Sequence, residues 1–117
     1  MKLFARTDAR CYAHTKIGIF PFRTPYYADE AGPRLTTIYY QEILQSRAFK
    51  QVVTIPHRVS SDNQAIWWGR RERCDLVMLP EVVYMLDGSG ALTNRLEINV
   101  RIINVRSGQL LWNFTQN

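Results

Sequence analysis

The sequence contains few of the residues from which metal and cofactor sites are built. Its 117 residues include two histidines, His14 and His57, and two cysteines, Cys11 and Cys74. Four metal ligands cannot be assembled from these residues by local spacing, which structural zinc sites require. We therefore expect no metal ion and no cofactor, and we interpret both histidines as loop residues.

The motifs that carry phosphate binding and nucleophilic catalysis are also absent. The first apolar run is followed by residues 21–25, PFRTP, which offer neither a G-x-G-x-x-G loop nor a Walker lysine. Ser89 lies in Gly-Ser-Gly rather than in a G-x-S-x-G elbow. Asp75 and Glu81 would need facing geometry to act as an acid–base pair, so we interpret Asp75 as an acid of the helix-to-strand loop and Glu81 as a solvent-side acid. The sequence predicts a protein without catalytic residues.

Long hydrophobic runs are missing as well. No run approaches the roughly 20 apolar residues that span a bilayer. Residues 1–4 begin as a signal peptide does, but Arg6, Asp8 and Arg10 stand where its apolar core would lie. Cys11 follows Asp-Ala-Arg, which is not a lipidation motif. The chain is therefore expected to be either cytosolic or a mature segment whose export signal lies outside these residues.

The two cysteines leave the redox compartment open. Cys11 and Cys74 would pair in an oxidising compartment, whereas Cys74 alone, just before an apolar run, has the character of a small buried residue. Both a disulfide and free thiols remain predictions.

The composition is that of one globular domain, with 46% hydrophobic and 21% charged residues. The net charge is +5, but the basic residues are spread along the chain. Only Arg70, Arg71 and Arg73 cluster, and Glu72 lies among them. Nucleic acid is therefore not expected as a partner, because its binding calls for a concentrated basic surface.

Hydrophobic periodicity predicts seven elements in the order strand, helix, strand, helix, strand, strand, strand. The expected strands lie at about residues 16–22, 51–55, 75–86, 96–103 and 110–114, and the expected helices begin near residues 28 and 61. The second of these helices opens with a four-residue capping-box pattern, in which Ser61 is the cap residue and Gln64 follows three positions later. Pro80 is expected to mark a bulge or kink, and residues 87–90 and 106–109 are expected turns. The alternating first half and the meandering second half predict an α/β fold, a three-layer or two-layer sandwich around one mixed sheet of about five strands.

The first helix has two apolar sides. Its main side, which we expect to face the core, carries Leu35, Ile38, Tyr39, Ile43 and Phe49. Tyr40 and Leu44 fall on the far side. They are candidates for contact with another subunit, and the alternative is a helix enclosed within one domain.

Tryptophan provides the other candidate contacts. Trp67 and Trp68 are neighbours on the second helix, where adjacent side chains diverge by about 100°, so both cannot face one core. Trp67 lies on the side of Arg70 and Arg71, and a tryptophan beside arginine suits a membrane interface, a subunit contact or a sugar ring. Trp112 shares a face of the last strand with Leu110 and Phe114, which favours the core.

Three stretches resemble a known family: KIGIFPF (residues 16–22), LTTIYYQEILQSRAFKQVVTI (35–55), and CDLVMLPEV with LEINVRIINVRSGQLLW (74–82 and 96–112). The most specific part is the final hairpin, with its pattern V-x-x-G-x-x-x-W. These stretches are similar to the CsgG-like, or TolB N-terminal-like, domains of periplasmic and outer-membrane lipoproteins. The resemblance covers residues 16–117 and leaves residues 1–15 as an N-terminal arm.

Within that family the small single-domain form most resembles the PelC-like lipoproteins of Pel exopolysaccharide export. The resemblance implies a non-enzymatic protein, lipid-anchored at the periplasmic face of the outer membrane. Its implied partners are copies of itself in a ring, an outer-membrane pore protein, a polysaccharide and the membrane surface. An aromatic residue would contact the membrane, and Trp67, Trp68 and Trp112 are the candidates.

The family also has a helix after the last strand and a lipidated cysteine upstream, and the resemblance implies that both lie outside these 117 residues. Because Pel polymer is cationic, its guide needs an acidic surface. The chain must therefore gather its ten acidic residues on one surface or serve another polymer. Two alternatives stay open: another CsgG-like accessory (a flagellar, transporter or cell-wall synthase lipoprotein), or a small α/β ligand-binding domain.

Overall fold

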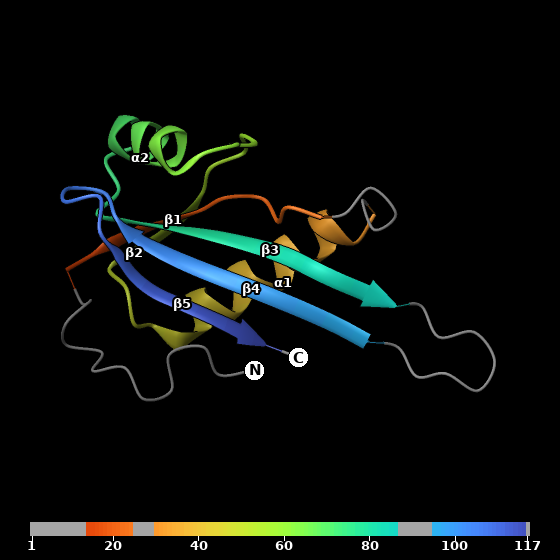
Figure 1. Cartoon of the computed structure of the whole chain (residues 1–117). Helices are drawn as coiled ribbons and strands as arrows, with labels where there is room; N and C mark the ends of the chain where they lie inside the picture. The colour runs from red at the N-terminus through yellow and green to blue at the C-terminus, as the bar shows by residue number, and fades with distance from the viewer. Residues whose placement is uncertain (1–13, 25–29, 87–94, 117) are drawn as a thin grey trace.

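The computed structural model describes residues 14–24, 30–86 and 95–116. Their elements follow the expected order (Figure 1). The strands are β1 (Lys16–Ile19), β2 (Gln51–Thr54), β3 (Leu76–Leu86), β4 (Arg95–Asn104) and β5 (Leu110–Gln116), and the helices are α1 (Ala31–Ser46) and α2 (Asp62–Arg71). The expected turn at residues 87–90, most of the N-terminal arm and Cys11 lie outside the described residues.

The strands form one open mixed sheet in the order β2-β1-β3-β4-β5. β1 pairs in parallel with β2 and β3, and β3, β4 and β5 form an antiparallel meander. The predicted division into a parallel first half and an antiparallel second half is confirmed.

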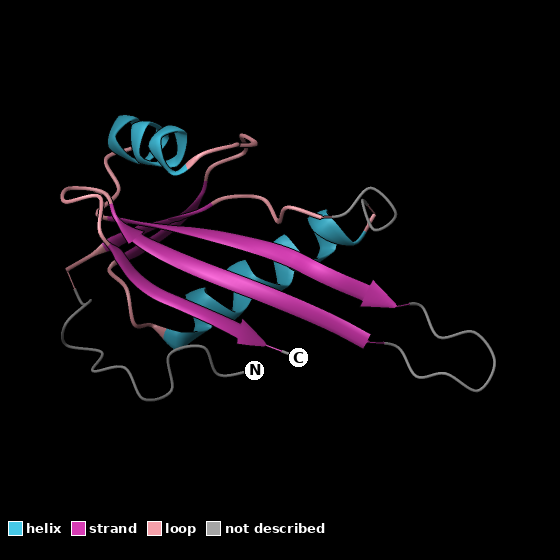
Figure 2. Ribbon diagram, viewed as in Figure 1, coloured by secondary structure: helices cyan, strands magenta, loops and turns pink. Residues whose placement is uncertain are grey.

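The two helices lie on opposite faces of this sheet, which makes three layers (Figure 2). Successive residues of each strand point to opposite faces of the sheet, so alternate residues belong to two different cores. The α1-side core joins Tyr39 and Ile43 to residues such as Ile17 and Met78. The α2-side core joins Ala65 to a second set that includes Val77, Ile103 and Val105. The three-layer alternative is therefore the correct one.

Pro80 does not interrupt β3, contrary to the prediction of a bulge or kink there. It is fully buried and paired with Val100, and the irregularity lies between Val82 and Tyr84. The carbonyl of Pro80 accepts a 3.0 Å hydrogen bond from the amide of Arg23, on the β1 side. Since the two polar backbone groups of a strand residue point to the same side, the donor that proline lacks would also point there. The β3–β4 ladder therefore loses nothing.

A register shift in the β4–β5 hairpin also changes a prediction. Trp112 pairs with Ile102, which belongs to the α1-side core, whereas Leu110 pairs with Ile103 of the α2-side core. Paired residues share a face, so Leu110 and Trp112 lie on opposite faces rather than on one. Trp112 is partly buried against the α1-side core, and Leu110 is 51% exposed.

The core-facing side of α1 is centred on Tyr39 and Ile43, which are buried as expected. Ile38 was expected on that side but is 46% exposed, and Tyr40 was expected on the far side but packs partly buried against the core. The buried stripe is thus displaced toward Tyr40. Leu44 is 44% exposed, and Phe49 is buried beyond the end of the helix.

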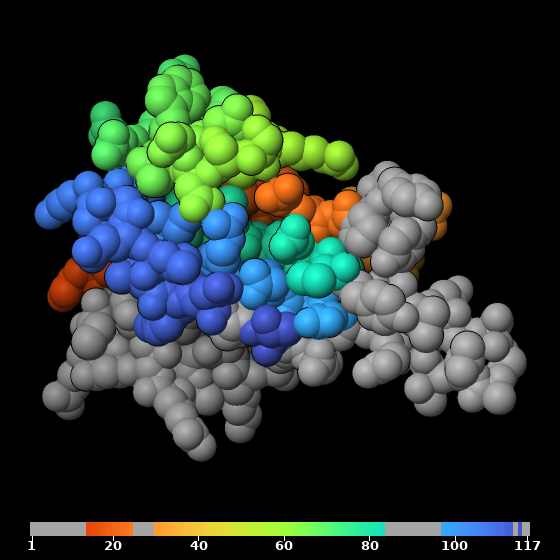
Figure 3. Space-filling model, viewed as in Figure 1, coloured from red at the N-terminus to blue at the C-terminus, as the bar shows by residue number. Residues whose placement is uncertain are grey.

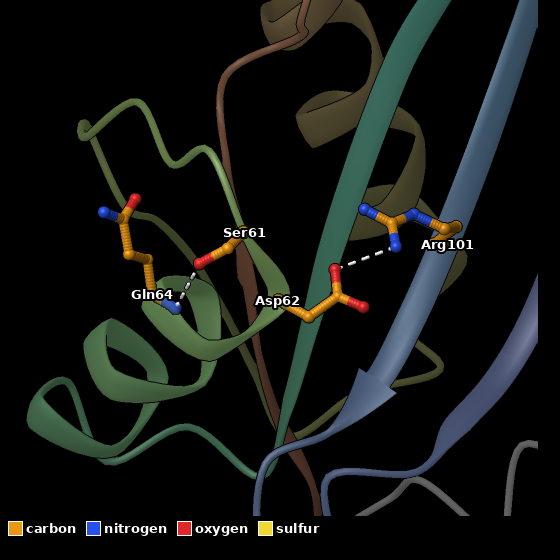
Figure 4. A network of polar contacts seen from close by, with 4 residues as sticks. All are labelled: Ser61, Asp62, Gln64 and Arg101. Carbon is orange, nitrogen blue, oxygen red and sulfur yellow. Dashed lines mark hydrogen bonds and ion pairs between the residues drawn. The ribbon is translucent and has the colours of Figure 1, made fainter.

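The start of α2 is fixed by the capping residues that the sequence predicted (Figure 4). The hydroxyl of Ser61 accepts a 3.2 Å hydrogen bond from the amide of Gln64, which satisfies one of the free donors of the first turn. The side chain of Gln64 accepts from the amide of Ser60 rather than from that of the cap residue. Asp62 also forms a 2.8 Å ion pair with Arg101 of β4, which ties the helix to the sheet.

Candidate functional site

Among the residues whose exposure the structure describes, the most exposed aromatic side chain lies on α2. Trp67 is 54% exposed, and the guanidinium carbon of Arg71 lies 5.4 Å from its ring centroid. Trp67 meets Trp68 edge-on, with centroids 4.9 Å apart, and Trp68 stacks on His57 at 3.7 Å with an interplanar angle of 12°. We call these four residues the aromatic stack.

The aromatic stack runs from the margin of the α2-side core to the solvent. Trp68 packs partly buried against the α2-side core and lies between His57 and Trp67, so the exposed ring of Trp67 rests on a ring that is itself packed on the core. Arg70, Arg71 and Arg73 are all exposed at the same end of the helix. An exposed indole beside several cations can bind a flat apolar surface bordered by negative charge, such as an anionic membrane surface or an acidic sugar. The space-filling view shows α2 and the loop before it standing out as a layer of their own (Figure 3).

The predicted contact residues do not form one surface. Trp67, Trp68, Arg70 and Arg71 come from α2. Tyr40 and Leu44 belong to α1, on the opposite side of the sheet, and Trp112 packs against the α1-side core. Any contact made by Trp67 is therefore separate from one made by Leu44.

A cleft of about 380 Å³ opens at the carboxyl ends of the parallel strands β1 and β2. The chain leaves β1 toward α1 on one face and leaves β2 toward α2 on the other, and ligands of open α/β sheets bind at such points. The lining combines apolar residues such as Ile19, Phe22 and Ile55 with threonines and Arg58.

The polar groups of this cleft are largely engaged. The Thr36 hydroxyl accepts from the amide of Phe22 at 3.0 Å and donates to the carbonyl of Gly32 at 2.8 Å. The Thr37 hydroxyl donates to the carbonyl of Pro33. Among the described residues, the lining includes no histidine, cysteine or carboxylate. The cleft has room for a small molecule but offers no general acid or base.

Cys74 is buried, as its small apolar character predicted, and it forms no disulfide with a described residue. Burial raises its pKa to about 11, and the neighbouring charges of Lys16, Glu72 and Asp75 change that value less. Such a thiol is a poor nucleophile. Its predicted disulfide partner Cys11 lies outside the described residues, so the disulfide remains a prediction.

The described part of the chain lacks two further kinds of feature. No three residues among its histidines, cysteines, aspartates and glutamates come together in a way that would hold a metal ion. Neither helix in this part has the length and apolar character needed to cross a membrane.

Sequence reasoning missed two partners of the α2 surface. His57 was interpreted as an isolated loop residue, yet it stacks on Trp68 eleven positions later along the chain. Arg101 was given no role beyond a position in the strand, yet it forms the ion pair with Asp62. Neither pairing has a local signal, because each depends on how distant segments pack. The proline at position 56, which ends the strand just before His57, is the nearest hint of a fixed loop.

Comparison with known proteins finds solved structures that have a similar fold. No protein-family model and no curated protein matches the sequence. Among solved structures, the chain superposes on a PelC dodecamer from Paraburkholderia phytofirmans with a TM-score of 0.73 and 17% identity, over 89% of this chain and 70% of that chain.

Two other lipoprotein-related structures are similar. The LpoB C-terminal domain from Salmonella enterica gives a TM-score of 0.68 at 9% identity, over 90% of this chain and 82% of that one. Lipoprotein GNA1162 from Neisseria meningitidis gives 0.61 at 15% identity, over 87% and 80%. The CsgG-like family itself remains a prediction at these identities. The chain therefore has the α/β fold that PelC, the LpoB C-terminal domain and GNA1162 share.

Proposed function

We propose that this protein is a non-enzymatic accessory of the bacterial envelope that assembles with copies of itself and guides a polysaccharide across the outer membrane. Its place would be the periplasmic face of that membrane, held by a lipid anchor outside residues 1–117. Its partners would be an outer-membrane pore protein and the exported polymer. No bond is made or broken in this role, so binding surfaces carry the function.

The observation that carries the proposal is the agreement with PelC over most of both chains, at a TM-score of 0.73. That structure is a dodecamer, which supports self-assembly here. The described cleft adds no acid–base group that would favour an enzyme. Sequence resemblance and fold therefore favour the same kind of protein.

The charge distribution favours a polymer other than a cationic one. Seven of the ten acidic residues lie in the described part of the chain, and they are spread over both helices, β3, β4 and the adjoining turns. They do not gather on one surface that could guide a cation. The exposed arginines at the end of α2 suit an anionic polymer or an anionic lipid instead.

The aromatic stack is the proposed membrane contact. Replacing Arg70 and Arg71 together by glutamine is expected to weaken binding to vesicles of mixed phosphatidylglycerol and phosphatidylcholine roughly 30-fold, since each arginine near an anionic surface contributes about 1 kcal/mol. Trp67→Ala is expected to weaken binding further, because the exposed indole is lost. Co-sedimentation with the vesicles measures both effects.

A matched control removes the same charge from the other side of the sheet. Arg34→Gln combined with Lys50→Gln changes two exposed cations near α1 and is expected to leave vesicle binding nearly unchanged. Equal losses from the two double variants would mean that only net charge matters, and the α2 surface would then not be the membrane contact.

The function itself is tested in the organism that carries the gene. Deletion is expected to stop release of an extracellular polysaccharide while the polymer is still synthesised and collects inside the outer membrane. Sugar analysis of the medium and of the periplasmic fraction measures both quantities, and the wild-type gene should restore release. Unchanged release would overturn the export role.

A second candidate function rests on the LpoB C-terminal domain, because the chain covers 82% of that structure. It is an accessory role for a different envelope machine: a cell-wall synthase, a transporter or the flagellum. The deletion strain separates the two, since this candidate predicts normal polymer release together with a change in wall synthesis, transport or motility.

A further inference from the structure

Within the described part of the chain, the outer edge of β5 lacks two common protections of an exposed sheet edge, which are charged residues and proline. Its seven residues, LLWNFTQ, include no charged residue and no proline, although lysine and proline are what usually keep sheet edges from pairing. β5 is the last strand of the sheet on its side, and Leu110 and Leu111 at its start are 51% and 38% exposed. Such an edge readily accepts another strand.

The pairing geometry identifies which backbone groups point outward at this edge. The polar backbone groups of Pro80 point away from β4, so those of its partner Val100 point toward β5. Val100 therefore exchanges hydrogen bonds with Phe114, its partner on β5. Asn113 and Thr115 flank Phe114, so their amides and carbonyls point outward, away from the sheet.

The opposite edge of the sheet is formed by a short strand of similar composition. β2, the last strand on the other side, reads QVVT and also has neither charge nor proline. A ring forms when one surface of each copy contacts a different surface of the next. The two edges of this sheet are such a pair of different surfaces, and neither carries a charge that would repel the other.

We propose that the outer edge of β5 is an assembly surface that takes up a strand edge of a second copy of this chain, with β2 of that copy as the partner strand. The inference rests on the proposed self-assembly and specifies the surface that carries it. The backbone groups of Asn113 and Thr115 make the contact, and the exposed Leu110 and Leu111 contribute apolar area beside it. Repetition of this contact from copy to copy would build the ring.

Proline substitution tests the edge without breaking the fold. Thr115→Pro and Asn113→Pro each remove an amide that points outward, and proline is tolerated on an edge strand when its missing donor faces solvent. Both variants are expected to reduce the mass measured by light scattering to that of one chain, 13.7 kDa. Thr115→Lys keeps the amide but adds a charge at the edge, and it should also give the single chain.

The alanine variants Thr115→Ala and Asn113→Ala are the matched controls, since they lose the same side chains but keep the amides. They are expected to assemble as the wild type does. Circular dichroism and the thermal midpoint verify that each proline variant is folded, and Thr115→Lys serves where one is not. If the wild type assembles and the folded proline or lysine variants assemble equally well, the edge inference is wrong and self-assembly stands. If the wild type is itself a single chain at every concentration, the proposed self-assembly is wrong.

Discussion

Replacing Gly18 by valine is expected to lower the free energy of unfolding by about 3 kcal/mol or more, a large part of the 5–15 kcal/mol typical of such a domain. A Cβ atom at this position would lie 2.6 Å from Cδ1 of Ile55 and 2.9 Å from Sγ of Cys74, both in the α2-side core. The backbone cannot move aside, because β1 is hydrogen-bonded to β2 and β3 on both sides. Urea unfolding followed by circular dichroism measures the loss.

A smaller substitution shows whether this contact is the cause. Ile55→Val deletes the Cδ1 atom, so Gly18→Ala should cost about 1 kcal/mol less in the Ile55→Val protein than in the wild type. Gly32→Ala is the matched control: its Cβ would meet Thr24 Cγ2 at an ordinary 3.4 Å within a helix, and stability should be unchanged or slightly higher. Equal costs of Gly18→Ala in both backgrounds would mean that Ile55 is not the obstacle.

Local patterns were sufficient to predict the elements. They could not predict the register between paired strands or the neighbour that each backbone group faces. The order of elements and the cap at Ser61 follow from periodicity and from a four-residue motif, and both are confirmed. The faces of Leu110 and Trp112 could not be predicted, because one register shift at Ile102/Ile103 reverses the alternation. The effect of Pro80 was predicted wrongly for a similar reason: whether a missing amide matters depends on which neighbour it would face.

In the candidate site, too, local geometry was predicted and tertiary packing was not. That Trp67 and Trp68 diverge on α2 follows from helix geometry, and the exposure of Trp67 agrees with it. That His57 stacks on Trp68 depends on the path of the loop after β2, which no local pattern determines. Tyr40 was assigned to a far-side patch because a helical wheel gives only angles. The sheet packs against a stripe displaced toward Tyr40, and only the assembled layers show that.

Truncation of Tyr39 is expected to lower the free energy of unfolding by about 3–5 kcal/mol, as for other large aromatic residues replaced by alanine. The side chain is fully buried in the α1-side core, and its ring meets that of Phe22 edge-on with centroids 4.9 Å apart. The helix α1 is attached to the sheet chiefly through Tyr39 and Ile43, so their contacts hold this layer in place. Leu44→Ala, an exposed position on the same helix, should cost far less. Similar losses from both variants in urea unfolding would contradict this assignment.

The hydroxyl of Tyr39 adds an alkaline dependence that Tyr39→Phe isolates, since phenylalanine keeps the ring. Burial, and secondarily the charge of Glu42, raises the pKa of Tyr39 from 10.0 to about 12. The folded protein thus holds this proton after the unfolded chain has lost it, so stability is complete below pH 10 and falls as the pH rises toward 12. A shift of two units corresponds to at most about 3 kcal/mol.

Cys74, with its pKa raised to about 11, acts in the same direction, so the comparison belongs in a Cys74→Ala background. In that background, the free energy of unfolding should fall less steeply between pH 10 and 12 for Tyr39→Phe than for the protein that keeps Tyr39. The reason is that phenylalanine has no phenol proton to lose at this position. Parallel curves would mean that the phenol is not kept protonated by its burial.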